Sequence, residues 1–257
     1  MCSMIIPKVE FSIASLEDTF PVIHYFLNPS KGDWDWSNVI YLDYPKLKYK
    51  LQNIKDKKKR KDVEYRFFTD VLKKERIKLE KQKLVFQREW YKINDDIMLA
   101  LSKIVEQEWS DKDKKMFARI SLDPICPRYI EQRTFDLCFK QKIEYMKSIV
   151  IHEILHFIYF EKWKKVFPKT QEKEFNKPYL VWHLSEMVVG IILNDKRIQD
   201  IFKYEFYSYK EYQDCRLNGK PLLSYLQTFY DNKKDFTDFL KKSWQFVKKY
   251  EKEIKSI

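Results

Sequence analysis

At 257 residues the chain is long enough to bury a sizeable core, and its 44% hydrophobic and 17% aromatic content excludes an intrinsically disordered protein. The scarcity of glycine, limited to Gly32, Gly190 and Gly219, excludes the phosphate-binding loops of P-loop and dinucleotide-binding proteins and favours a mostly helical chain. The 50 basic and 38 acidic residues leave a net charge of +12; because most basic residues are lysines spread along helical faces, a solvated surface is favoured over a nucleic-acid partner.

The cysteines and the N-terminus bear on the compartment. None of Cys2, Cys126, Cys138 and Cys215 forms a C-x-x-C pair, which is typical of free thiols in a reducing compartment. The first residues lack the basic segment and the long apolar run of a signal peptide. No stretch is apolar and free of charge over the ~18 residues that a spanning helix needs. We therefore expect a cytoplasmic protein with no membrane partner.

The first fifty residues alternate between short elements. Lys8–Ser15 alternates apolar and polar residues and predicts a strand, and Ser15 followed by two acids predicts a helix start. This helix should end by Asn28-Pro29. It contains His24, which we interpret as a packed histidine. Gly32–Trp36 is expected to be a loop and Val39–Leu42 a short strand.

From Lys46 the pattern becomes helical and highly charged. Lys55–Lys61 is the densest basic run; it could contact phosphate or an acidic partner, but a run inside a helical pattern is usually a solvated face. Asp62–Trp109 has almost no helix breaker and predicts two long helices, with a break near Lys83 or Asn94. We expect a core-facing stripe that includes Val63, Phe67, Val71, Leu72, Ile77 and Leu84.

Two strand patterns then precede the most informative stretch. Met116–Leu122 and Thr134–Phe139 both read as strands. Lys140–Lys165 predicts a buried helix that contains His152-Glu153-Ile154-Leu155-His156, an HExxH pattern. Positions four apart lie on one side of a helix, so His152 and His156 can hold one Zn²⁺. Glu153 would stand beside the ion, where a general base can take a proton from activated water.

The alternative is a helix with two satisfied core histidines and a buried glutamate. Burying these polar groups with no common partner would cost several kcal/mol, which favours the metal site. The motif resembles that of the HExxH zinc metallopeptidases (zincins). The metzincin branch is excluded, because its pattern needs Gly where Tyr159 stands and His where Lys162 stands. A gluzincin-like arrangement remains, in which a glutamate from a later helix is the third ligand.

The resemblance also implies a strand at the edge of a sheet beside the metal, to which an extended peptide substrate can add. Thr134–Phe139, just before the motif helix, is the candidate for this strand. An ordinary core strand is an equally good interpretation of the same residues.

The third ligand is expected on Tyr179–Leu193, where Glu186 is the single formal charge of an otherwise apolar helix. A buried carboxylate of this kind is costly unless it pairs or binds a metal. His183, one turn earlier, could ligate instead or could donate a hydrogen bond to a developing oxyanion. Glu172 and Glu174, in the lysine-rich connector before this helix, are expected to be solvated.

The residues that would support the first histidine are not assigned. In the thermolysin-like pattern an aspartate lies four residues after the third ligand, and Gly190 occupies that place here. Gly190 would instead permit close helix approach. Asn194 and Asp195 could substitute for the aspartate or could simply end the helix.

The remaining residues predict a closing helical segment. Tyrosines are frequent in Arg197–Tyr212, and we assign none of them a role. Asn218–Pro221 predicts a turn, and Leu222–Tyr230 and Phe236–Ile254 predict helices.

The sequence thus predicts an α+β, predominantly helical fold with a zincin-like active-site helix and a small antiparallel sheet. We expect one domain over residues 1–257, with subdomains at 1–115 and 116–257. The favoured function is a zinc-dependent intracellular metallopeptidase acting on a peptide or protein substrate, with Zn²⁺ held by His152, His156 and Glu186. The competing hypothesis is a basic helical module that binds nucleic acid or protein, in which the HExxH residues are inactive or structural.

Overall fold

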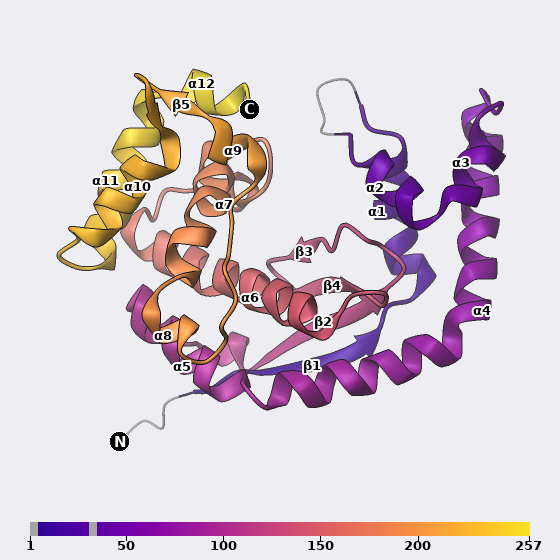
Figure 1. The fold of residues 1–257 in the computed structure, drawn as a ribbon, viewed down its shortest axis with the longest axis horizontal. Coiled ribbons are helices and arrows are strands. Elements are labelled where there is room, and N and C mark those ends of the chain that lie inside the picture. Colours follow the sequence, from indigo (N-terminus) through magenta and orange to yellow (C-terminus); the bar gives the residue numbers. More distant parts are fainter. Residues whose placement is uncertain (1–4, 31–34) are drawn as a thin grey trace. The chain divides into compact units, whose positions relative to one another are not determined.

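The computed structural model describes residues 5–30 and 35–257, which form two compact units. The unit that we call the helical unit comprises residues up to 8, 93–114 and 147–257. The sheet unit comprises residues 9–92 and 115–146. Each unit is discontinuous in sequence, unlike the subdomains expected at 1–115 and 116–257. Within the described residues the chain is predominantly helical with small sheets, as expected for the α+β class (Figure 1).

The sheet unit surrounds a four-stranded sheet with order β1-β2-β4-β3. Its elements, most of which the sequence predicts, are β1 (Lys8–Ile13), α1 (Leu16–Leu27), α2 (Ser37–Asp43), α3 (Pro45–Leu51), α4 (Lys57–Tyr91), β2 (Lys115–Ser121), β3 (Arg128–Tyr129) and β4 (Thr134–Cys138). Ser15 caps α1 by accepting a hydrogen bond from the amide of Asp18, as expected. Most of the expected Gly32–Trp36 loop lies outside the described residues.

The sheet is mixed and not antiparallel throughout. Strand β4 runs parallel to β2, from the pair Phe117 and Thr134 to the pair Ser121 and Cys138, and antiparallel to β3. Parallel strands need a connection of about a dozen residues, which residues 122–133 supply between β2 and β4. The expectation that Thr134–Phe139 forms an edge strand is wrong, because β4 has a hydrogen-bonded neighbour on each side.

Two other expectations for the sheet unit are wrong. Val39–Leu42 belongs to the helix α2 and not to a strand; an apolar run of this length has too few residues to show its period, and only Ile40 is buried. The core-facing stripe of α4 includes Phe68, Leu79 and Phe86, whereas Ile77 and Leu84 are exposed. The buried face of α4 therefore lies at a different angle around the helix axis from the predicted stripe.

The long charged region is otherwise as predicted. Helix α4 begins at Lys57, capped by Asp56, and ends at Tyr91. Helix α5 (Asn94–Val105) follows it, so the predicted break near Asn94 is confirmed. Figure 1 shows α4 curving along its length, with its first turns beside α3 and its last turns near β1 and β2.

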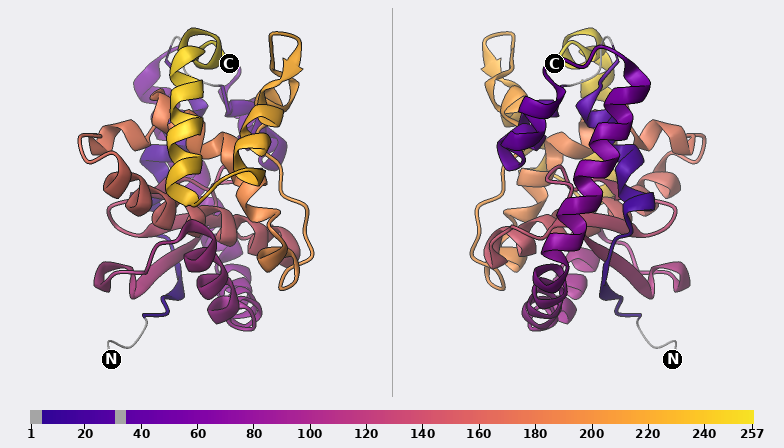
Figure 2. Two further views of the ribbon diagram at one scale, coloured as in Figure 1. Left: turned by 90° about the vertical axis from the view of Figure 1, so that its left-hand side faces the viewer. Right: turned by 90° about the vertical axis from the view of Figure 1, so that its right-hand side faces the viewer.

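The helical unit is organised around helix α7 (Leu180–Leu193), which packs against η2, α10, α11 and α12 (Figure 2). All residues of α7 except Trp182 are buried. The other elements of this unit are α5, η1 (Asp111–Asp113), most of α6 (Ile143–Val166), η2 (Glu172–Phe175), α8 (Lys196–Gln199), α9 (Lys210–Asp214), β5 (Arg216–Leu217), β6 (Lys220–Pro221), α10 (Leu222–Asp231), α11 (Phe236–Lys249) and α12 (Glu251–Lys255).

The expected turn and closing helices are present in this unit. Asn218 and Gly219 have φ angles of 50° and 77° and join β5 to β6, which are the signs of a tight hairpin turn. The closing helix predicted over Phe236–Ile254 is divided into α11 and α12. No helix among the described residues has the length and apolar character needed to cross a bilayer.

His24 and the cysteines, to which we assign no catalytic or metal-binding role, have structural roles or are free thiols in the described residues. His24 stacks on Phe20 and bonds through Nδ1 to the buried carboxylate of Glu64, so it is a packed histidine as expected. Cys126, Cys138 and Cys215 are free thiols. Cys2 lies outside the described residues.

Candidate metal centre

The HExxH residues lie in the middle of α6, which is a continuous helix from Ile143 to Val166. Its apolar side chains on both sides of the motif are buried, which fixes the helix in the core of the helical unit. His152 and His156 are one turn apart and point to the same side, with their ring centroids 4.8 Å apart. The sequence prediction of a buried motif helix is therefore confirmed.

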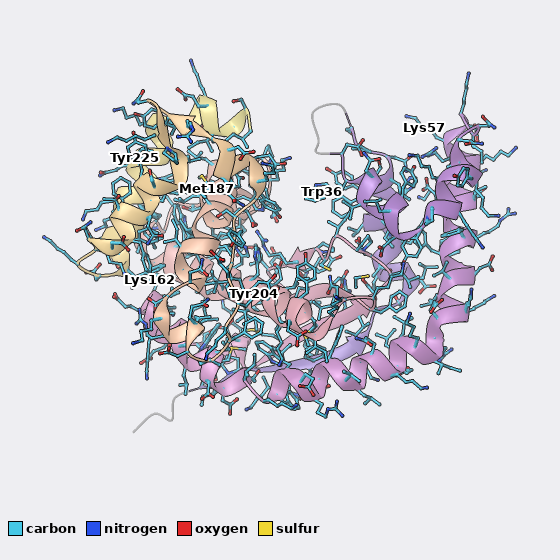
Figure 3. The ribbon with its side chains drawn as sticks, in the orientation of Figure 1. Trp36, Lys57, Lys162, Met187, Tyr204 and Tyr225 are labelled. Atoms are coloured by element: carbon cyan, nitrogen blue, oxygen red, sulfur yellow. The ribbon has the colours of Figure 1, made fainter. Side chains whose placement is uncertain are left out.

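Three side chains converge at this point, two from α6 and one from α7. The Nε2 atoms of His152 and His156 are 3.0 Å apart. Glu186 brings its carboxylate to both: Oε2 lies 3.3 Å from Nε2 of His152 and Oε1 lies 3.4 Å from Nε2 of His156. In Figure 3 the label of Met187 marks the part of α7 that carries Glu186.

The size of this triangle can be compared with what a metal ion requires. In a tetrahedral zinc site with bonds of about 2.0–2.1 Å, neighbouring ligand atoms are about 3.3–3.4 Å apart. The two Nε2 atoms are 3.0 Å apart and each lies 3.3–3.4 Å from a different oxygen of Glu186, while one ligand atom from each of the three residues lies within 4.8 Å of the others. Two imidazoles and a carboxylate are also ligands that zinc commonly takes. The donor set is therefore one that zinc takes, and the three side chains are close enough to share one ion.

The three side chains of the centre differ in their exposure to solvent. The side chains of His156 and Glu186 are each 1% exposed, whereas that of His152 is 25% exposed. His156 stacks on Phe160, which in turn stacks on Phe175 of η2 with ring centroids 4.4 Å apart. This aromatic stack packs against the ring of His156, whereas the ring of His152 is partly accessible to solvent.

Glu153 lies next to the cluster and outside it. Its Oε1 is 3.9 Å from Nε2 of His152, compared with 3.3 Å for the carboxylate of Glu186. The side chain is 9% exposed, so it is shielded from bulk water. A carboxylate in this position can exchange a proton with a molecule bound beside His152.

His183 is buried in α7, and its nitrogens are not among the ligand atoms that converge on the cluster. Its Nδ1 lies 2.8 Å from the hydroxyl of Tyr212, a residue of α9 to which sequence reasoning assigned no role. Burial, together with the positive charges of Lys177 and Lys255, lowers the pKa of His183 to about 4. The imidazole is therefore neutral at pH 7, and if the Tyr212 hydroxyl donates to Nδ1, Nε2 carries the ring proton.

The glutamates of the connector are not part of the centre. Glu172 is exposed and pairs with Lys164, and Glu174 accepts a hydrogen bond from the amide of Gln171. The structure agrees with the expectation for Glu172, whereas Glu174 is half-buried and stabilises the start of η2.

Residues that follow Glu186 contact the segment 203–209, which is neither helix nor strand. Figure 3 labels Tyr204 in this segment. A Cβ on Gly190 would lie 3.0 Å from the carbonyl oxygen of Phe206, so this glycine permits close approach of that segment and not of another helix. Asn194 bonds through its amide to both the N–H and the C=O of Phe206. Asp195 caps α8, so both residues serve the helix ends.

Comparisons with protein-family models, with curated proteins and with solved structures found no match to this chain.

Proposed function

We propose that this chain is a zinc-dependent metallopeptidase in which His152, His156 and Glu186 hold the ion. The observation that carries the proposal is the convergence of His152, His156 and Glu186 from two helices, with one ligand atom from each residue lying within 4.8 Å of the others. When bound, zinc supplies a Lewis acid and an activated water. Glu186 comes from a helix that otherwise carries no charge, and a metal ion is a partner that offsets the burial of its carboxylate.

Glu153 is the proposed general base. Its carboxylate is close to the cluster and shielded from solvent, so it can accept a proton beside His152 and return it to a leaving amine. A carbonyl oxygen that gains negative charge is stabilised by a positioned hydrogen-bond donor, which can be neutral or cationic. His183 is the proposed donor: its lowered pKa keeps the imidazole neutral, and Nε2 carries the proton when the Tyr212 hydroxyl donates to Nδ1.

The decisive experiment measures metal content. Wild-type protein, Glu186→Ala and the control Glu172→Ala are purified without chelator, incubated with zinc, desalted and measured by elemental analysis. Wild type and Glu172→Ala should each retain close to one equivalent of zinc, and Glu186→Ala should retain far less. Equal retention in all three proteins would contradict the assigned ligand set.

Peptidase activity is tested separately, with a pool of peptides derived from a whole proteome and new termini identified by mass spectrometry. Wild type should generate termini that a Glu153→Gln sample, carrying the same zinc, does not. A zinc-loaded wild type that cleaves no peptide in the pool would leave a metal-binding protein and remove the peptidase assignment.

A further inference from the structure

The most strongly charged surface of the sheet unit is formed by α3 and the first turns of α4. We call residues 46–61 the basic hairpin: α3, the connection at residues 52–56, and the start of α4. It contains nine basic residues and a single acid, Asp56, and so carries a net charge of +8 out of +12 for the whole chain. Including the next residue, Asp62, lowers this to +7. The positive charge is therefore concentrated and not spread evenly.

The lysines of the hairpin are exposed. These eight residues are Lys46, Lys48, Lys50, Lys55, Lys57, Lys58, Lys59 and Lys61. Among residues 5–30 and 35–257, no carboxylate lies within ion-pair distance of any of them. Asp56 is used as the cap of α4, where it accepts a hydrogen bond from the amide of Lys59. Within the described residues the eight lysines thus have no carboxylate partner, whereas Arg60 pairs with the buried Glu64.

The hairpin is a fixed structure and not a flexible basic tail. Leu47 and Leu51 of α3 are buried, which places the lysines of α3 on the solvent side. Arg60, the one basic residue turned inward, bonds to Asn28, to the hydroxyl of Tyr41 and to the carbonyl oxygen of Leu51. These bonds tie the first turns of α4 to α2 and α3, so the lysines project from a preorganised surface.

The N-terminal end of α4 adds to the positive potential. Its first turn contains lysines and no acidic residue, and Figure 3 labels Lys57 there. Backbone N–H groups give a helix N-terminus a partial positive charge, so each cation there destabilises the helix by about 0.3–1 kcal/mol. A bound anion would offset both the dipole and the lysine charges.

We propose that the basic hairpin binds the phosphate backbone of double-stranded nucleic acid, independently of base sequence. The closely spaced lysines are complementary to a partner of high negative charge density, and duplex DNA presents about one negative charge per 1.7 Å. An anionic membrane is a poorer fit, because interfacial helices insert an exposed apolar face and the apolar face of α3 is buried in the protein. Tyr49, exposed between Lys48 and Lys50, adds an aromatic surface to the lysine row.

This proposal does not depend on the metal centre. The hairpin lies in the sheet unit, and the residues of the metal centre lie in the helical unit. Loss of nucleic-acid binding is therefore expected to leave zinc content unchanged, and Glu186→Ala is expected to leave nucleic-acid binding unchanged.

Binding is tested by fluorescence anisotropy of the full chain with labelled 24-base-pair duplexes of DNA and of RNA, in KCl from about 50 to 300 mM. Each phosphate contact contributes about −0.9 to the slope of log K against log[KCl] for DNA, so four to six contacts predict a slope of about −4 to −5. Binding of either duplex with this salt dependence, regardless of sequence, supports the proposal.

A matched pair of variants locates the surface. Lys48, Lys50, Lys57 and Lys58 are replaced by Gln in one protein, and the control replaces Lys73, Lys74, Arg76 and Lys81, which are exposed further along α4. Both lose four charges, and circular dichroism verifies their helix content. The hairpin variant should lose at least ~30-fold in affinity and much of the salt slope, while the control stays within about 5-fold of wild type.

Three results would overturn the proposal. One is the absence of salt-dependent binding to both duplexes. Another is an equal loss of affinity in the hairpin variant and the control, since binding would then follow net charge alone. The third is that wild type binds phosphatidylserine vesicles or polyglutamate and neither duplex, which would assign the hairpin to a different partner.

Discussion

The hydroxyl of Tyr212 lies 2.8 Å from Nδ1 of His183, and this contact joins α9 to the helix that carries Glu186. Both groups are buried, and burial raises the pKa of the Tyr212 hydroxyl above its ordinary value, so the phenol keeps its proton. A neutral hydroxyl and a neutral imidazole can share one hydrogen bond without introducing a charge into the core.

The lowered pKa of His183 predicts a pH dependence of stability. The unfolded chain protonates this residue near pH 6.5 and the folded chain near pH 4, so unfolding takes up a proton between these values. The free energy of unfolding should fall as the pH drops through this window, by up to ~3 kcal/mol. Urea unfolding of the zinc-free protein and of His183→Gln measures the difference. An NMR titration that places His183 near pH 6.5 would contradict this prediction.

Asp123 in the sheet unit predicts the opposite dependence. This carboxyl is fully buried, its Oδ2 has no hydrogen-bond partner, and burial raises its pKa to about 7. The folded chain therefore holds a proton that the unfolded chain releases above about pH 4. The stability that the folded chain gains from this proton is lost as the pH rises from about 4 to about 7.

Asp123→Asn tests this prediction, because Asn keeps the Oδ1 acceptor that bonds the amide of Ile125. The variant should be more stable than wild type at pH 8 and similar to it at pH 4.5, measured by urea unfolding. A variant less stable than wild type at pH 8 would show that the Asp123 carboxylate has a stabilising partner.

Glu153→Gln should separate metal binding from hydrolysis. The amide cannot accept a proton as the carboxylate does, so the rate of peptide cleavage should fall by about 10²–10⁴-fold. Zinc content should not change, since Glu153 is further from the imidazole of His152 than Glu186 is. Glu161→Gln, on the same helix and paired with Lys112 at the surface, is the matched control and should keep full activity.

Zinc should stabilise the folded chain. A ligand that binds only the folded state adds about 2.7 kcal/mol when present at a hundred times its dissociation constant. Zinc should therefore raise the Tm of wild type in differential scanning calorimetry. The same addition should leave the Tm of Glu186→Ala almost unchanged, and an equal rise in both proteins would point to zinc bound elsewhere.

Gly190→Ala should destabilise the helical unit. The added Cβ would lie 3.0 Å from the carbonyl oxygen of Phe206 and 3.4 Å from the amide of Ser208, so backbone has to move. Displacement of a packed segment typically costs about 1–3 kcal/mol. Urea unfolding measures this loss, and Ser185→Ala on the same helix is a control for a small change of side chain. A loss below ~0.5 kcal/mol would show that residues 203–209 shift freely.

The sequence predicts the elements whose pattern is long and whose burial is extreme. Helix α6 is found because its central run from Ile149 to Phe160 is apolar apart from the HExxH residues. Helix α7 is found because almost all of it is apolar, and its single charge draws attention to Glu186. The turn at Asn218-Gly219 is found because those residue types favour its positive φ angles. These features can be predicted because the residues that cause each of them lie within the element itself.

Features that depend on distant partners are not found in this way. Whether β4 lies at an edge depends on pairing with β2 and β3, which no residue within β4 specifies. Tyr212 reaches His183 only because α9 folds back onto α7, so its role is absent from the local pattern. On α4, charged residues surround the whole helix, and the hydrophobic period is too weak to distinguish the buried Phe86 from the exposed Leu84.

The unequal exposure of the two motif histidines has a consequence for small-molecule competitors. A thiol or hydroxamate directed at the proposed zinc would approach past the ring of His152, because the side chains of His156 and Glu186 are each 1% exposed. Bulky substituents on such a compound would meet the protein beside His152, so potency should depend on the width of the inhibitor near its chelating group more than on its length.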